Sequence, residues 1–159
     1  MHSPKRTLAV VGTRPEGIKM LPVVQSLLAS PHLDVVGVDT GQHQEILTDI
    51  FQLFDYEPSI RLDVMRPGQA LSPLFARVLN ALDPILAAEQ PDALLIQGDT
   101  TTAMAAGLAA FHRRIPVVHV EAGLRTDTVH NPFPEEANRR LTARIASLHL
   151  APTATSRDN

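Results

Sequence analysis

The sequence contains no cysteine and no tryptophan, and only 4% of its 159 residues are aromatic. Without cysteine the chain can form no disulfide, no thiolate metal site and no cysteine nucleophile. Its 17 acidic residues outnumber its 14 lysines and arginines, so it lacks the basic excess that binding to a nucleic-acid backbone usually requires. No uninterrupted apolar run reaches the roughly 18 residues of a membrane span. We therefore expect neither nucleic acid nor a membrane as a partner.

The composition is that of an ordinary folded domain. Hydrophobic residues make up 44% of the chain, which excludes intrinsic disorder. Domains usually contain about 100–200 residues, so we expect residues 1–159 to form a single domain. The first seven residues lack the basic and then apolar pattern of a secretory leader, and we expect a cytoplasmic protein.

Short apolar runs alternate with segments of helical periodicity along the chain. The runs predict buried strands at residues 8–11, 35–38, 60–64, 93–96, 117–120 and 148–150. The periodic segments predict helices at about residues 18–30, 46–54, 74–90, 102–114 and 135–147. This alternation predicts an α/β fold, a doubly wound parallel sheet of the Rossmann-like kind with helices on both faces.

In such sheets, ligands bind beyond the carboxyl ends of the strands. The residues that follow the strands are therefore the candidates for chemistry. They are residues 12–14, 39–43, 98–100 and 121–123.

The segment at residues 12–19 joins the first strand to the first helix. It lacks two of the three glycines of a dinucleotide fingerprint and misses the phosphate-loop spacing by one position. Residues 13–16 form a capping box with proline in the first helical turn, but this role does not require Arg14. An arginine beside a helix N-terminus suits the charge and geometry of a diphosphate. We expect Arg14 to bind an anion, whereas Lys19 is equally compatible with a solvated surface.

Asp99 and Glu121 each follow a buried strand. Asp99 could simply help to cap the next helix, although the three threonines at residues 100–102 exceed what one cap requires. If the two strands are neighbours, about 4.8 Å apart, the two side chains form a carboxylate pair. Like charges at that separation raise one pKa, which tunes a carboxylate for acid–base chemistry near neutral pH.

Other candidates have ordinary structural explanations. Glu135 lies at the start of the last predicted helix, where an acidic residue is stabilised by the helix dipole. His119 lies inside a predicted strand and is expected to be a core residue, while His43 fits either a helix entry or the crevice. The seven histidines show no metal-ligand spacing, so we expect no metal site.

Several segments together carry a resemblance to a known family. They occur in the family's order and spacing at residues 12–16, 42–43, 97–102, 119–125 and 134–139. From about residue 7 to residue 159 the chain resembles the bacterial non-hydrolysing UDP-N-acetylglucosamine 2-epimerases. The Gly-Asp-Thr-Thr-Thr and His-Val-Glu-Ala-Gly-Leu-Arg segments are the most specific.

This resemblance implies reversible epimerisation at C2 of UDP-N-acetylglucosamine to UDP-N-acetylmannosamine. UDP leaves and re-adds through a bound glycal, and no redox cofactor or metal takes part. Asp99, Glu121 and Glu135 would be the catalytic carboxylates, with Asp99 and Glu121 also contacting the substrate. Arg14 and Lys19 would bind the diphosphate.

The resemblance also implies features beyond the catalytic residues. Gln42 and Glu135 would contact a second, activating UDP-N-acetylglucosamine. The full-length enzyme would be a homodimer that supplies cell-envelope polysaccharide biosynthesis.

Enzymes of this family have two Rossmann-like domains in the glycosyltransferase-B arrangement, with the active site between them. The 159 residues match the N-terminal domain, and the C-terminal domain, with its uridine contacts and a catalytic histidine, has no counterpart in them. We therefore expect little turnover from this chain alone. The alternatives are a hydrolysing 2-epimerase, a nucleotide-sugar glycosyltransferase of the same fold, and a non-catalytic binding domain.

Overall fold

The structure is a computed structural model that describes residues 3–159, apart from the side chain of Gln44. Met1 and His2 lie outside the described residues. They are the first two of the seven residues in which the sequence shows no secretory-leader pattern. The strands are β1 (Lys5–Val11), β2 (Leu33–Asp39), β3 (Ile60–Arg61), β4 (Ala93–Gln97), β5 (Val117–Val120) and β6 (Leu148–Leu150). The helices are α1 (Arg14–Leu28), α2 (Gln44–Leu53), α3 (Leu71–Glu89), α4 (Thr101–His112), α5 (Glu135–Ile145) and α6 (Ala154–Asp158).

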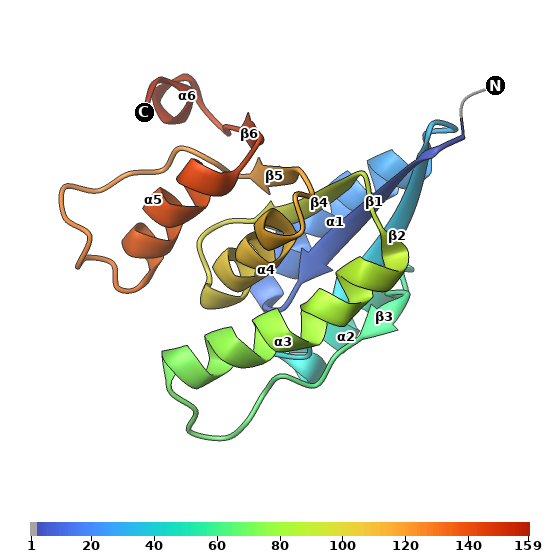
Figure 1. The fold of residues 1–159 in the computed structure, drawn as a ribbon, viewed down its shortest axis with the longest axis horizontal. Coiled ribbons are helices and arrows are strands. Elements are labelled where there is room, and N and C mark those ends of the chain that lie inside the picture. Colours follow the sequence, from blue (N-terminus) through green and yellow to red (C-terminus); the bar gives the residue numbers. More distant parts are fainter. Residues whose placement is uncertain (1–2) are drawn as a thin grey trace.

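All six strands of the described residues lie in one parallel sheet, in the order β3-β2-β1-β4-β5-β6 (Figure 1). The chain adds strands outward from β1 to β3, then returns to the centre and continues in the other direction from β4. This is the strand order of the Rossmann-like fold, and its ligand-binding crevice lies at the reversal between β1 and β4. The predicted doubly wound α/β sheet is confirmed.

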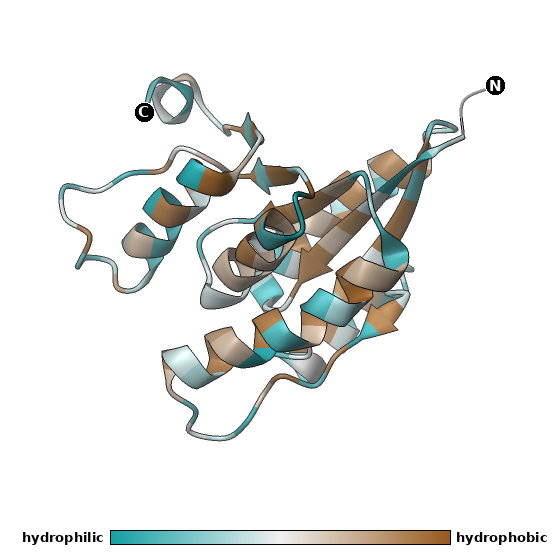
Figure 2. Cartoon of the chain, viewed as in Figure 1, coloured by the Kyte–Doolittle hydropathy of each residue, from teal (hydrophilic) through white to brown (hydrophobic). Residues whose placement is uncertain are grey.

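The alternation of side chains along the strands builds two separate core layers. Leu8 and Val10 of β1 pack with apolar residues of α3 and α4. Ala9 and Val11 point to the opposite face and pack with α1 and α2. Figure 2 shows hydrophobic residues concentrated in the central strands, with hydrophilic residues along the loops and outer helix faces. Because both faces of the sheet are covered, the carboxyl ends of its strands are left as the place for a site.

Most predicted elements are present, with differences at their ends. α1 begins at Arg14, four residues before the predicted start, because Glu16 caps the backbone N–H groups of Gly12 and Thr13. β3 is shorter than predicted, with only Ile60 and Arg61 in ladder pairing. The five-residue α6 was not predicted, because one turn is too short to show a helical period.

Helix α3 is the one helix of the described residues whose length and composition would allow it to cross a membrane. The core helix of a folded domain meets the same criterion, and the expectation of no membrane partner stays a prediction. Leu74, Val78, Leu82 and Leu86 form a buried stripe of α3 that packs in the core.

Gly123 provides a test of how α6 is held against the sheet. Its φ is +87°, and a Cβ there would collide with the backbone carbonyl of Ser156. Gly68 also has a positive φ, +65°, but a Cβ there meets no atom within 4 Å. We expect Gly68→Ala to cost about 1 kcal/mol through backbone strain, and Gly123→Ala to cost about 3 kcal/mol or more. Urea unfolding measures both, and equal costs would contradict the close approach.

Candidate active site

The loops that follow β1, β4 and β5 meet at one edge of the sheet. The N–H of His43, which precedes α2, donates to the carbonyl oxygen of Gly12 at 3.0 Å. The N–H of Gly98 donates to the carbonyl oxygen of Val120, also at 3.0 Å. Main-chain hydrogen bonds therefore join neighbouring loops, so side chains far apart in the sequence are brought to the same edge.

The turn between β1 and α1 is organised by Glu16. Its carboxylate accepts hydrogen bonds from the N–H groups of Gly12 and Thr13, at 2.7 and 2.8 Å, and from the hydroxyl of Thr100. Burial raises the pKa of Glu16, although these hydrogen bonds act in the opposite direction. The carboxylate thus occupies the N–H groups of Gly12 and Thr13, which precede the first turn of α1. Arg14 is exposed beside this turn.

Glu121 is held by two partners from different strands and helices. The Nζ of Lys19 lies 2.7 Å from each of its carboxylate oxygens, and the amide nitrogen of Gln97 donates to one of them. The backbone of Glu121 has a φ of +63°, in the left-handed region that a residue with a long side chain rarely adopts. Such strain is concentrated at functional sites. It supports the choice of Glu121 as a candidate.

Asp99 is partly exposed, and it is paired with a different cation. A guanidinium nitrogen of Arg139 lies 2.9 Å from its carboxylate, and the side-chain amide of Asn138 donates to its backbone oxygen at 2.9 Å. Burial raises the pKa of Asp99, and Arg139 lowers it in part. The negative charges of Glu135 and Glu121 raise this pKa further. The three predicted carboxylates are thus close enough to affect one another electrostatically.

β4 and β5 are neighbouring strands, as the carboxylate pair required. Gln97 pairs with Val120 in the ladder, and Asp99 and Glu121 follow these two residues at the same edge. The condition on which the carboxylate pair depended, that the two strands are neighbours, is met. The two carboxylates nevertheless have separate cationic partners, one from α1 and one from α5.

Gln42 is placed at another part of the same edge. Its side-chain oxygen accepts a hydrogen bond from the hydroxyl of Thr102 in the first turn of α4. Among the described residues, no hydrogen bond joins Gln42 to Glu135. A shared role for these two residues in binding an activator stays a prediction.

His119 is a core residue, as its strand position predicted. It is buried, and its Nε2 lies 2.7 Å from the carbonyl oxygen of Gly98. Burial lowers its pKa, so the imidazole is neutral and Nε2 donates the hydrogen bond. His119 therefore supports the turn that precedes Asp99. Within residues 3–159, no three His, Cys, Asp or Glu side chains are grouped to hold a metal ion.

Sequence reasoning missed the residues that hold the carboxylates in place. Arg139 and Asn138 on α5 bind Asp99, and Gln97 on β4 binds Glu121. The sequence does indicate the ion pair between Glu136 and Arg139, because residues three positions apart are neighbours on the surface of a helix. No local pattern indicates the contact between Arg139 and Asp99.

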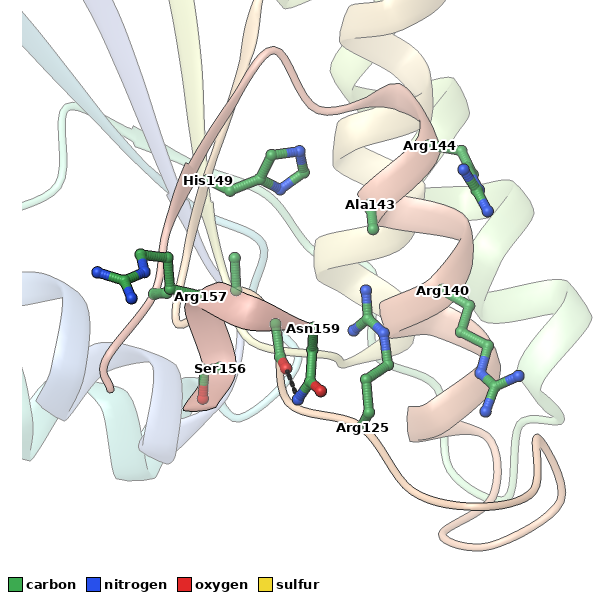
Figure 3. Close-up of a pocket in the computed structure, with 11 residues that line it drawn as sticks. Arg125, Arg140, Ala143, Arg144, His149, Ser156, Arg157 and Asn159 are labelled. Atoms are coloured by element: carbon green, nitrogen blue, oxygen red, sulfur yellow. Dashed lines mark hydrogen bonds between the residues drawn. The ribbon is translucent and has the colours of Figure 1, made fainter. Parts of the chain in front are cut away.

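A cavity of about 600 Å³ lies between α5, β6 and α6 (Figure 3). Arginine side chains from the loop after β5, from α5 and from α6 surround it, together with His149. It touches the loop at Ala122 and Gly123 but is not lined by Asp99, Glu121 or Lys19. The carboxylates therefore lie outside this cavity.

The burial of Glu136 leads to a prediction about pH. Burial by itself raises its pKa, but hydrogen bonds from Arg140 and Arg139 outweigh burial, and the pKa lies below its ordinary value of 4.5. Ionised Glu136 therefore stabilises the fold above that pH, and this stabilisation is lost as the pH falls below it. We expect Glu136→Gln to lower stability near neutral pH and to flatten the acid decline.

Urea unfolding between about pH 7 and pH 3 tests this prediction. Glu57→Gln is the matched control, because Glu57 is exposed and pairs with Arg61 on the surface. If the stability of Glu136→Gln falls as steeply with decreasing pH as that of the unsubstituted chain, the prediction is contradicted.

Comparison with known proteins identifies the family of this chain. The sequence model of a family described as UDP-N-acetylglucosamine 2-epimerase matches residues 25–159. UDP-N-acetylglucosamine 2-epimerase of Salmonella typhimurium is 51% identical over 154 residues, which cover 97% of this chain and 41% of the relative. The crystal structure of UDP-GlcNAc 2-epimerase from Neisseria meningitidis bound to UDP-GlcNAc is 43% identical, with a TM-score of 0.93. That match covers 96% of this chain and 41% of the Neisseria chain.

A more distant similarity concerns the fold alone. MurG from Acinetobacter baumannii is 16% identical, with a TM-score of 0.68, over 96% of this chain and 43% of MurG. It agrees with a Rossmann-like half of the glycosyltransferase-B type of architecture. The family match covers most of the chain, and the chain spans about 41% of the length of the curated relatives it matches. This chain therefore belongs to the UDP-N-acetylglucosamine 2-epimerase family of isomerases.

Proposed function

We propose that this chain is the N-terminal domain of an enzyme that interconverts UDP-N-acetylglucosamine and UDP-N-acetylmannosamine without hydrolysing them. The observation that carries the proposal is the pair Asp99 and Glu121, which follow the adjacent strands β4 and β5 next to the sheet reversal. The negative charge of Glu135, at the start of α5, raises the pKa of Asp99. Inversion at a carbon next to an acetal requires proton transfer on both faces of the sugar, and several carboxylates suit that requirement.

The proposed reaction has two halves that balance without an external reagent. One carboxylate takes the C2 proton, the C1–oxygen bond breaks, and UDP leaves with its electron pair to give a glycal. A second group then delivers a proton to the opposite face of C2, and a UDP oxygen bonds to C1 again. The geometry leaves open whether Asp99 or Glu121 takes the first proton.

In this proposal Arg14 and Lys19 stabilise the negative charge of the departing diphosphate. Arg14 is exposed at the start of α1, and Lys19 on the same helix contacts Glu121. Their positive charges oppose the negative charge that develops on UDP as it leaves. A second UDP-N-acetylglucosamine would contact Gln42 and Glu135 as an activator.

The second wall of the cleft is part of the proposal. The chain spans 41% of its curated relatives, and one wall cannot hold both ends of a nucleotide sugar or exclude water from an intermediate. The complete enzyme would be a cytoplasmic homodimer that binds UDP-N-acetylglucosamine and UDP. Its product would feed cell-envelope polysaccharide biosynthesis.

Substitution of the carboxylate pair tests the chemistry. In a full-length version of the protein, we expect Asp99→Asn and Glu121→Gln each to reduce deuterium exchange at C2 by at least about 100-fold, because each removes proton transfer. Exchange is measured by NMR in deuterium oxide. Asp83→Asn is the control, because Asp83 pairs with Arg113 on the exposed surface. Normal exchange in both variants would contradict the carboxylate assignment.

The products separate the proposal from its closest rivals. UDP-N-acetylmannosamine as the product supports simple epimerisation, whereas free N-acetylmannosamine would establish a hydrolysing 2-epimerase. Transfer of the sugar to an added acceptor would establish a glycosyltransferase.

The 159-residue chain should bind UDP weakly and turn over poorly. We expect epimerisation at least about 100-fold slower than in a full-length version, because one wall leaves the substrate misplaced. Calorimetry with UDP should show weak binding that Arg14→Ala abolishes, while Arg157→Ala, in the cavity beside α6, leaves it unchanged. A coupled assay that gives near-normal turnover by this chain would overturn the requirement for a second wall.

A further inference from the structure

Four charged side chains form a continuous row that ends at Asp99. Arg140 binds one carboxylate oxygen of Glu136 at 2.7 Å, and Arg139 binds the other at 2.9 Å. Arg139 also reaches Asp99, at 2.9 Å. The row therefore runs from the exposed surface of α5 through a buried glutamate to the candidate active site.

The burial of these groups differs in a way that assigns their roles. The side chain of Glu136 is inaccessible to solvent and that of Arg139 is 9% exposed, whereas that of Arg140 is 44% exposed. A buried carboxylate bound by two guanidinium groups is rigid, because moving either partner leaves an unpaired buried charge. Glu136 therefore fixes the position of Arg139, and Arg139 in turn fixes Asp99.

We propose that Arg139 is a positioning residue that, anchored by Glu136, clamps the Asp99 carboxylate at the edge of the crevice. The clamp is a property of this chain by itself. Its catalytic consequence rests on the function proposed above, in which Asp99 transfers a proton.

The surroundings of Asp99 explain why this arginine is needed. Burial and the charges of Glu135 and Glu121 all favour the protonated form of Asp99. Lys19 on α1 opposes them, but it is already bound to Glu121. His119 on β5 is buried and neutral, so it adds no positive charge. Arg139 is therefore the main cation that holds Asp99 in its charged form.

Arg140 offers a matched control on the same helix. It binds the same glutamate as Arg139, and it also donates to the carbonyl oxygen of Thr126 at 2.8 Å. It makes no hydrogen bond or ion pair to Asp99 among the described residues. Loss of Arg140 thus removes a positive charge from the same helix and leaves both ion pairs of Arg139, to Glu136 and to Asp99, in place.

The experiment is an NMR pH titration of the Asp99 carboxyl carbon in the 159-residue chain, assigned with Asp99→Asn. We expect Arg139→Gln to raise the Asp99 midpoint by about one pH unit, and Arg140→Gln to leave it nearly unchanged. An unchanged midpoint in Arg139→Gln, or an equal rise in both variants, would overturn the proposal.

A second pair of variants covers the case in which Arg139→Gln does not fold. Lysine keeps the positive charge but is a single point of contact, so it cannot bind Glu136 and Asp99 together. We expect Arg139→Lys to raise the Asp99 midpoint measurably and Arg140→Lys to leave it unchanged. If the Asp99 titration midpoint in both lysine variants equals that of the unsubstituted chain, the proposed clamp is overturned.

A kinetic measurement separates this proposal from the proposed function. In a full-length version, Arg139→Lys should lower kcat with little change in KM, and move the acidic limb of the pH–rate profile upward. If Asp99→Asn retains exchange at C2, the catalytic role of Asp99 fails while the titration result still stands. If the titrations fail but Asp99→Asn abolishes exchange, only the positioning role of Arg139 fails.

Discussion

The parallel pairing of β4 with β5 is the interaction on which the candidate site depends. Because Gln97 lies beside Val120 in the ladder, the residues that follow both strands emerge at the same edge. Asp99 and Glu121 are 22 positions apart in the sequence, and only this pairing makes their charges interact. A shift in the register between β4 and β5 would move Asp99 and Glu121 relative to one another along the strand direction. Each carboxylate would then be displaced from the cation that binds it.

Two ion pairs then give the two carboxylates different environments. Lys19 on α1 binds Glu121, and Arg139 on α5 binds Asp99. These helices lie on opposite faces of the sheet, α1 with α2 and α5 beside α4 (Figure 1). Two similar groups at one edge thus have different cationic partners, each supplied by a different helix. The site draws on both layers of the domain, so neither half of the chain could form it alone.

The first turn shows how a local pattern and a tertiary contact combine. The capping box at residues 13–16 is visible in the sequence, and in the structure the buried carboxylate of Glu16 accepts from the N–H groups of Gly12 and Thr13. The same carboxylate also accepts from the hydroxyl of Thr100, a residue 84 positions away that no local pattern indicates.

Local patterns in the sequence determined the strands, most of the helices and the edge of the sheet where chemistry is expected. They did so because periodicity, caps and turns depend on residues within a few positions of one another. The family resemblance selected Glu135, which local pattern alone left as a helix-cap residue. Only the tertiary structure paired Asp99 with Arg139, a residue 40 positions away. Ion pairs of that range depend on how α5 packs against α4, and no local pattern encodes that packing.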